Sequence, residues 1–208
     1  MRTHGWGGAP PADDEEARER ILTATRACLA ATGTARTSEV AGALGITRQT
    51  VYRYFPTTDD LLNAAAMAAV VELQHDLTAD VRRHLAAGAD AADAVVEVVA
   101  FVYEHLRDDP ALNRLLAPGR IAGTLAGLTA PSSIHLGRSL LAGFGVDWAA
   151  QGWDPGRQHE LVEHLLRTLQ SLVLDPGDPE RSGTELRGYL QRWVAPAVRA
   201  VHQGTALP

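Results

Sequence analysis

The chain has 208 residues, of which 46% are hydrophobic, and its formal net charge is −6 at pH 7. This length allows one large domain or a small domain joined to a larger one, and the hydrophobic content is sufficient for a buried core. There is no run of about 18 apolar residues and no apolar signal-peptide segment, so we expect a cytoplasmic protein that does not enter a membrane. The single cysteine, Cys28, excludes an internal disulfide.

The first helix is predicted to follow a disordered tail. Residues 1–12 are rich in Gly and Pro and show no periodicity. Asp13 can cap a helix that runs to Gly33, with acidic residues in its first turn. The side chains at helical spacing on its inner face are Ile21, Thr25, Cys28 and Leu29.

Residues 37–55 read as two short helices joined by a tight turn. Thr37 can cap the first helix, and Gly45 can end it because glycine adopts the left-handed conformation without strain. Thr47 can cap the second helix, in which Val51 and Phe55 share one face. The inward residues of the first helix are Val40, Ala41 and Leu44, and Ile46 fills the turn.

The outer face of the second helix carries side chains that suit DNA. Arg48 can bind guanine and Gln49 can bind adenine through two hydrogen bonds each, and the methyl group of Thr50 can touch thymine in the major groove. Contacts to phosphate are expected from Tyr52, Arg53 and Tyr54. The net negative charge does not exclude DNA, because bases outnumber acids between residues 33 and 56.

A helical hairpin with a solvated polar face is the alternative interpretation of such a segment. The order Leu-Gly-Ile-Thr-Arg-Gln-Thr-Val-Tyr-Arg-Tyr-Phe-Pro over residues 44–56, with Ile21-Leu22 before it and Leu61-Leu62 after it, resembles the DNA-binding region of the tetracycline-repressor (TetR) family. The resemblance covers about residues 18–65. Thr58 stands where members commonly carry a Lys that contacts phosphate, so that contact is expected to be weaker here.

The resemblance implies an all-α homodimer with about nine helices per chain. It implies a three-helix helix-turn-helix DNA-binding domain over residues 13–58. Residues 59–208 would then form a helical bundle that binds a ligand and makes the dimer. It implies a transcriptional regulator without enzymatic activity, a repressor that a small-molecule effector releases from a palindromic operator. The alternative is a helical small-molecule-binding protein or enzyme with a vestigial DNA-binding motif. The expected DNA-contacting residues are Thr37, Thr47, Arg48, Gln49, Thr50, Tyr52, Arg53, Tyr54 and Thr58.

The remaining chain is predicted to be helical. Pro56 stops the second short helix, and residues 57–60 form a capping box for a long helix to about His84. Residues 90–108 are apolar on nearly every side, which is typical of a helix in the middle of a bundle. The other predictions are short or broken segments over 110–116 and 118–131, a helix over 132–142, an irregular loop over 144–154, and helices over 156–174 and 181–202.

The last two predicted helices have broad apolar faces that can pair with their symmetry copies or cover their own core. With the family resemblance, we expect a dimer interface that contains Leu165, Leu169, Leu172, Leu190, Trp193 and Val194. Ligand contacts are expected from Phe101, Tyr103, His135, Phe144 and Trp148, although side chains of this kind are more often core residues than ligand contacts. No metal site or cofactor is expected, because His159 and His164 are five residues apart and the other histidines lack ligand spacing.

Overall fold

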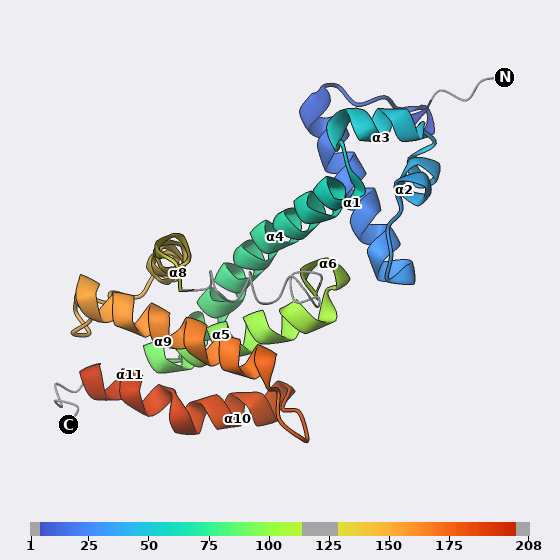
Figure 1. Cartoon of the computed structure of the whole chain (residues 1–208). Helices are drawn as coiled ribbons and strands as arrows, with labels where there is room; N and C mark the ends of the chain where they lie inside the picture. Colours follow the sequence, from blue (N-terminus) through green and yellow to red (C-terminus); the bar gives the residue numbers. More distant parts are fainter. Residues whose placement is uncertain (1–4, 114–128, 203–208) are drawn as a thin grey trace. The chain divides into compact units, whose positions relative to one another are not determined.

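The structure is a computed structural model that describes residues 5–113 and 129–202, and this part of the chain is all α-helical (Figure 1). It contains ten α-helices and one short 3-10 helix, close to the expected number. The chain divides into two compact units: unit 1 comprises residues 1–72 and 107–115, and unit 2 comprises residues 73–106 and 116–208. No helix in the described ranges is long and apolar enough to cross a membrane.

Unit 1 begins with α1, Asp14–Thr32, whose ends match the sequence prediction. Asp13 accepts a hydrogen bond from the backbone N–H of Glu16 (2.9 Å), and Gly33 ends the helix with a φ of 71°. The buried side chains are Ala17, Ile21, Thr25 and Leu29. Cys28 lies beside this row and is only partly buried; desolvation raises the pKa of its thiol, which keeps the thiol protonated.

Residues 5–12 were expected to belong to a tail, but two hydrogen bonds join them to α1. The carbonyl of Ala9 accepts from Arg20 Nη1 (2.5 Å), and the N–H of Ala12 donates to Glu16 Oε2 (2.6 Å). A short 3-10 helix, η1, spans Trp6–Gly8. Because these bonds come from charged side chains of α1, hydrophobic periodicity does not reveal them.

The other helices of unit 1 are α2 (Thr37–Leu44), α3 (Arg48–Tyr54), the first part of α4 (Thr58–Ala86) and α6 (Pro110–Asn113). The capping box before α4 is confirmed. Asp60 Oδ2 accepts from the Thr57 backbone N–H (3.1 Å) and Thr57 Oγ1 accepts from the Asp60 N–H (3.0 Å). Two donors at the helix start are thereby satisfied, so α4 begins at Thr58 as predicted.

Unit 2 contains the rest of α4, most of α5 (Ala91–Asp108) and four further helices. These are α8 (Pro131–Gly143), α9 (Pro155–Leu174), α10 (Gly183–Trp193) and α11 (Ala195–His202). The expected central position of α5 is confirmed, because Val95, Val96, Val99 and Ala100 are all buried in the core cluster. Figure 1 shows α9 and the α10–α11 pair running in opposite directions. A Cβ on Gly137 of α8 would lie 2.5 Å from Val162 Cγ1 of α9, so only glycine fits where these helices meet.

One predicted helix is divided in the structure. Residues 181–202 form α10 and α11, with a turn at Val194 between them. Pro196 lacks the N–H that would continue the helix and its ring clashes with the carbonyl four residues earlier, so the break is a local effect. Most of the segment 118–131 and the end of 110–116 lie outside the described residues.

Candidate nucleic-acid interface

The turn between α2 and α3 is built by backbone hydrogen bonds. Gly45 has a φ of 65°, and the N–H of Ile46 donates to the carbonyl of Ala41 (3.0 Å). Thr47 then caps α3, because its Oγ1 accepts from the backbone N–H of Thr50 (3.1 Å). The predicted roles of Gly45 and Thr47 are confirmed, and together they set the direction in which α3 leaves α2.

Helix α3 has one buried face and one exposed face. Val51 and Phe55 are buried, as expected. Arg48 and Gln49 are exposed in the first turn, and within the described part of the chain neither makes a hydrogen bond or ion pair. Tyr52 follows on the same side and is 44% exposed. The first turn of α3 therefore offers an Arg and a Gln side chain to an external partner.

Tyr54 lies on the buried face instead. It is 7% exposed, and its hydroxyl donates to Asp14 Oδ1 (2.7 Å) at the start of α1. The backbone carbonyl of Tyr54 accepts from Arg18 Nη1 (3.2 Å), which satisfies an unpaired carbonyl at the end of α3. Tyr54 therefore ties α3 to α1, whereas the sequence prediction had its hydroxyl facing phosphate. Its position three residues after Val51, on the same helix face, is the signal that could have shown this.

Four other expected contact residues, Thr37, Thr47, Thr50 and Thr58, have hydrogen-bond partners inside unit 1. Thr37 is buried and is the first residue of α2, with Arg36 rather than Thr37 at the cap position. Its Oγ1 lies 3.2 Å from Thr58 Oγ1 at the start of α4. The hydroxyls of Thr47 and Thr50 lie 2.9 Å apart. The hydroxyl groups of these threonines are therefore engaged within unit 1, at the starts of α2, α3 and α4.

Charge on the exposed face of α3 comes from two arginines in different environments. Arg53 has a side chain that is 66% exposed and lies 3.4 Å from Asp14 Oδ1, a solvated ion pair. Such a pair contributes little free energy, about 0–1 kcal/mol, so a phosphate can compete for the guanidinium. Arg48 has no such acidic neighbour in the residues that are described. Both positive charges are available to DNA.

The residues expected to contact a ligand lie in different places in unit 2. Phe101 stacks on His105 (centroids 3.9 Å apart), and the Tyr103 hydroxyl donates to Glu180 Oε1 (2.7 Å). Trp148 donates from Nε1 to the Leu141 carbonyl (2.9 Å), and His135 is exposed on α8. Phe144 lines a cavity in unit 2.

That cavity has a volume of about 370 Å³. Its walls come from the end of α4, the start of α5 with the turn before it, the loop that follows α8, and the middle of α11. Arg199 and Asp90 both line the cavity and form an ion pair, in which Arg199 Nε lies 2.8 Å from Asp90 Oδ2. The sequence did not indicate this cavity, because its walls come from three separate segments, residues 85–92, 144–151 and 198–199.

The residues expected in a dimer interface are mostly buried within unit 2. Leu190 and Val194 are 0% and 4% exposed, while Trp193 between them is 71% exposed. Buried residues of the same set on α9 are Leu165, Leu169 and Leu172. In one protomer, Trp193 is thus the member of the set that is open to a partner.

Comparisons with known proteins agree with this geometry. Residues 21–65 match the family described as "Bacterial regulatory proteins, tetR family", and this range contains α2, the turn and α3. No curated protein matches the chain.

Among solved structures, the chain is similar to the TetR family repressor AlkX from Dietzia sp. strain DQ12-45-1b, with 20% identity, a TM-score of 0.57, and coverage of 94% of this chain and 100% of that one. It also matches a transcriptional regulator from Rhodococcus sp. Rha1, with 19% identity, a TM-score of 0.49, and coverage of 92% of this chain and 100% of that one. A third match is the multidrug binding protein EbrR complexed with imidazole, with 23% identity, a TM-score of 0.49, and coverage of 91% of this chain and 96% of that one. The family match shows that residues 21–65 are a DNA-binding region of the kind found in TetR-family transcriptional regulators, and the likeness to AlkX shows that the chain has the corresponding helical fold.

Proposed function

We propose that this regulator is a repressor that binds a palindromic operator as a homodimer and that a small-molecule effector releases it. The observation that carries the proposal is the exposed first turn of α3, where Arg48 and Gln49 have no partner within the described chain. In the helix-turn-helix arrangement, the early residues of the second helix contact base edges in the major groove. Two copies can then read two half-sites about 34–36 Å apart.

The effector is proposed to bind in the cavity beside Phe144. Its volume of about 370 Å³ lies within the usual range for small-molecule pockets, about 300–1,000 Å³. The lining combines apolar residues, Leu85, Val146 and Val198, with polar ones, Asp147, Gln151 and the paired Asp90 and Arg199, which favours a compound that has both an apolar part and polar groups. Release from DNA requires that the dimer have a second arrangement in which the two recognition helices no longer fit both half-sites. The compound must bind this arrangement more tightly than it binds the DNA-bound one.

The experiment that tests the proposal is footprinting of the protein on the DNA upstream of its own gene, followed by a metabolite screen for release. We expect a protected palindrome and an affinity that falls steeply with salt, because phosphate contacts release counterions. An absence of salt-dependent protection would favour the alternative, a helical small-molecule-binding protein with a vestigial motif.

Replacing Arg48 by Ala should weaken specific binding by about 1–3 kcal/mol and relax the preference at one base pair per half-site. The reason is the loss of a bidentate contact to a base edge by an exposed side chain in the first turn of α3. Arg53→Ala serves as the matched control and should weaken binding to all sequences alike. The measurement is affinity for a panel of single-substituted operators. Uniform weakening by Arg48→Ala would instead make Arg48 a phosphate contact.

Thr58→Lys should tighten operator binding and steepen its salt dependence by up to about one phosphate contact per subunit. Thr58 is the first residue of α4, next to Asp59 and Asp60, so the native contact to phosphate is expected to be weak. Met67→Lys is the control: it adds the same charge at an exposed position nine residues further along the helix, roughly 13 Å away and beyond about one Debye length. Equal salt slopes for wild type and Thr58→Lys would show that α4 does not approach the DNA backbone.

A further inference from the structure

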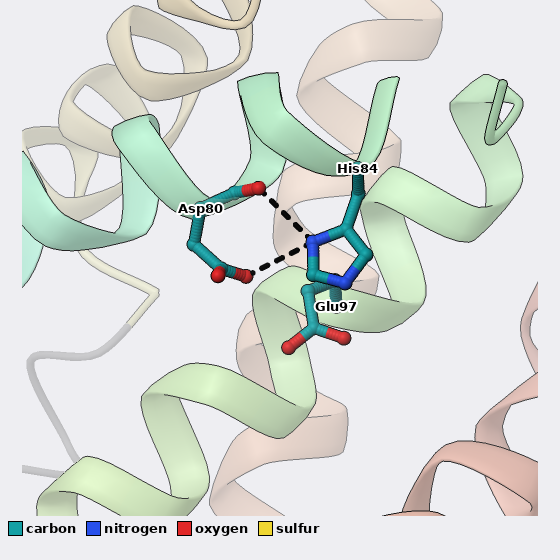
Figure 2. Close-up of side chains that lie close together, drawn as sticks. All are labelled: Asp80, His84 and Glu97. Carbon is teal, nitrogen blue, oxygen red and sulfur yellow. Dashed lines mark hydrogen bonds and ion pairs between the residues drawn. The ribbon is translucent and has the colours of Figure 1, made fainter. Parts of the chain in front are cut away.

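Three side chains that can bind a metal ion lie together in unit 2 (Figure 2). Asp80 and His84 are four residues apart on α4, so they share one helix face, and Glu97 comes from α5. One potential ligand atom from each residue lies within 4.8 Å of the other two. The sequence prediction of no metal site missed this group because it considered spacing between histidines and did not consider a carboxylate four residues before a histidine.

The Asp80–His84 half of this group already has the spacing that a metal ion requires. His84 Nδ1 lies 3.2 Å from Asp80 Oδ2 and 3.0 Å from the Asp80 backbone carbonyl, so Nδ1 must give up that carbonyl when it binds an ion. Two ligands about 2.0–2.1 Å from a tetrahedral Zn²⁺ lie roughly 3.3 Å apart. Figure 2 shows the Asp80 carboxylate and His84 Nδ1 directed toward each other, with Glu97 of α5 beside the imidazole. To become the third ligand, Glu97 must turn toward the ion and release hydrogen bonds with Arg187.

Asp80 Oδ2 is also an unsatisfied atom. It is buried, and within the described chain no group donates a hydrogen bond to it, although its partner oxygen Oδ1 accepts from Arg83 Nη1 (2.6 Å). A buried carboxylate oxygen without a donor is costly, and a cation at this position would satisfy it. This observation is independent of the spacing of the three residues and points to the same place.

The charges around the group favour a cation. Three carboxylates, Asp80, Glu97 and Glu104, face two guanidinium groups, Arg83 and Arg187, so the local charge is −1. Arg187 is hydrogen-bonded to both Glu97 and Glu104. It can therefore keep Glu104 as its partner when Glu97 turns toward an ion. Because Glu97 is buried, its charge is little screened by water.

We propose that Asp80, His84 and Glu97 bind one divalent transition-metal ion, with Zn²⁺ as the best fit, and that the ion cross-links α4 to α5. One imidazole nitrogen with two carboxylate oxygens suits Zn²⁺ or a related first-row ion, whereas Mg²⁺ and Ca²⁺ prefer oxygen ligands alone. Three protein ligands leave a fourth position for water. The proposal does not depend on the effector cavity or on DNA binding.

The test is titration of the metal-stripped full-length protein with ZnCl₂ by calorimetry. We expect one saturable site per chain for the wild type, and no comparable site for MgCl₂ or CaCl₂. His84→Ala should weaken Zn²⁺ binding by at least about tenfold, since even the loss of an outer-shell partner costs about 10–100-fold. His84 has a side chain that is 47% exposed, so its removal should leave the fold intact. Asp80→Asn, which keeps the shape of the side chain, should have a similar effect.

His75→Ala is the matched control, because His75 is an exposed histidine on the same helix outside the group. Its Zn²⁺ affinity should equal that of the wild type. A second measurement is the melting temperature, which Zn²⁺ should raise for the wild type and for His75→Ala but not for His84→Ala. Unchanged Zn²⁺ binding in His84→Ala and Asp80→Asn, loss of binding in His75→Ala, or no saturable binding by the wild type would each overturn the proposal. The Asp80–His84 contact would then be an ordinary pair at the end of α4.

Discussion

Trp193→Glu should convert the proposed dimer into monomers and lower operator affinity by about a hundredfold or more, although no residue of α2 or α3 is changed. Trp193 is 71% exposed at the end of α10, and large aromatic side chains of this kind are typical anchors of protein interfaces. A charge placed there must be desolvated if the interface is to close. Each monomer would then bind only one half-site, without the gain from simultaneous binding.

The measurement is sedimentation together with operator binding over a range of protein concentrations. Val71→Glu provides a control, because Val71 is also an exposed apolar residue, 63% exposed, but lies on α4. It should leave both mass and affinity unchanged. We choose Trp193 over Leu169, because Leu169 is buried in the core of unit 2 and its replacement by a charged residue would disturb folding as well. A Trp193→Glu protein that remains dimeric would place the interface elsewhere.

Arg187→Met should destabilise the protein by about 3 kcal/mol, among the largest effects expected of a single substitution. Arg187 of α10 binds both oxygens of Glu97, whose side chain is 8% exposed, and also binds Glu104, about two turns further along α5. Removing the guanidinium leaves a buried carboxylate without compensation. The hydrogen bonds to Glu97 hold the pKa of Arg187 above its ordinary value, so the guanidinium remains charged at all physiological pH.

The measurement is the free energy of unfolding in urea. The matched control is Arg167→Met, which breaks the i,i+4 pair with Glu163 on the surface of α9, where the two side chains are 60% and 36% exposed. That change should cost only about 0–1 kcal/mol. The double variant Arg187→Met, Glu97→Gln should recover part of the loss because no buried charge is then left alone. Equal losses for the two single Arg variants would show that burial does not strengthen the Arg187 pair.

The parts of the fold that the sequence predicted well depend on interactions between residues close in the chain. Asp13, Thr47 and the Thr57–Asp60 pair each bind a backbone or side-chain group about three residues away, so the start of each helix follows from local chemistry. Gly45 ends α2 because of its own backbone freedom. The helix-turn-helix segment is therefore recognisable from sequence alone.

The parts that the sequence did not predict depend on contacts between distant segments. Whether Tyr54 faced DNA or the core was decided by Asp14, 40 residues away, and by Arg18. The division of α10 from α11 is an exception, because Pro196 was visible in the sequence and its effect was overlooked.

What the sequence by itself determined is the set of helices and the recognition motif, since capping and helical periodicity act over one turn of chain. Only the tertiary structure decided which polar side chains meet. Glu97 lies beside the Asp80–His84 face and against Arg187, and Phe144 lines a cavity with Asp90 and Arg199. Each of these groupings joins separate helices whose packing is directed by apolar faces. The polar side chains are brought together by that packing, so their own spacing in the sequence contains no signal of the partner on the other helix.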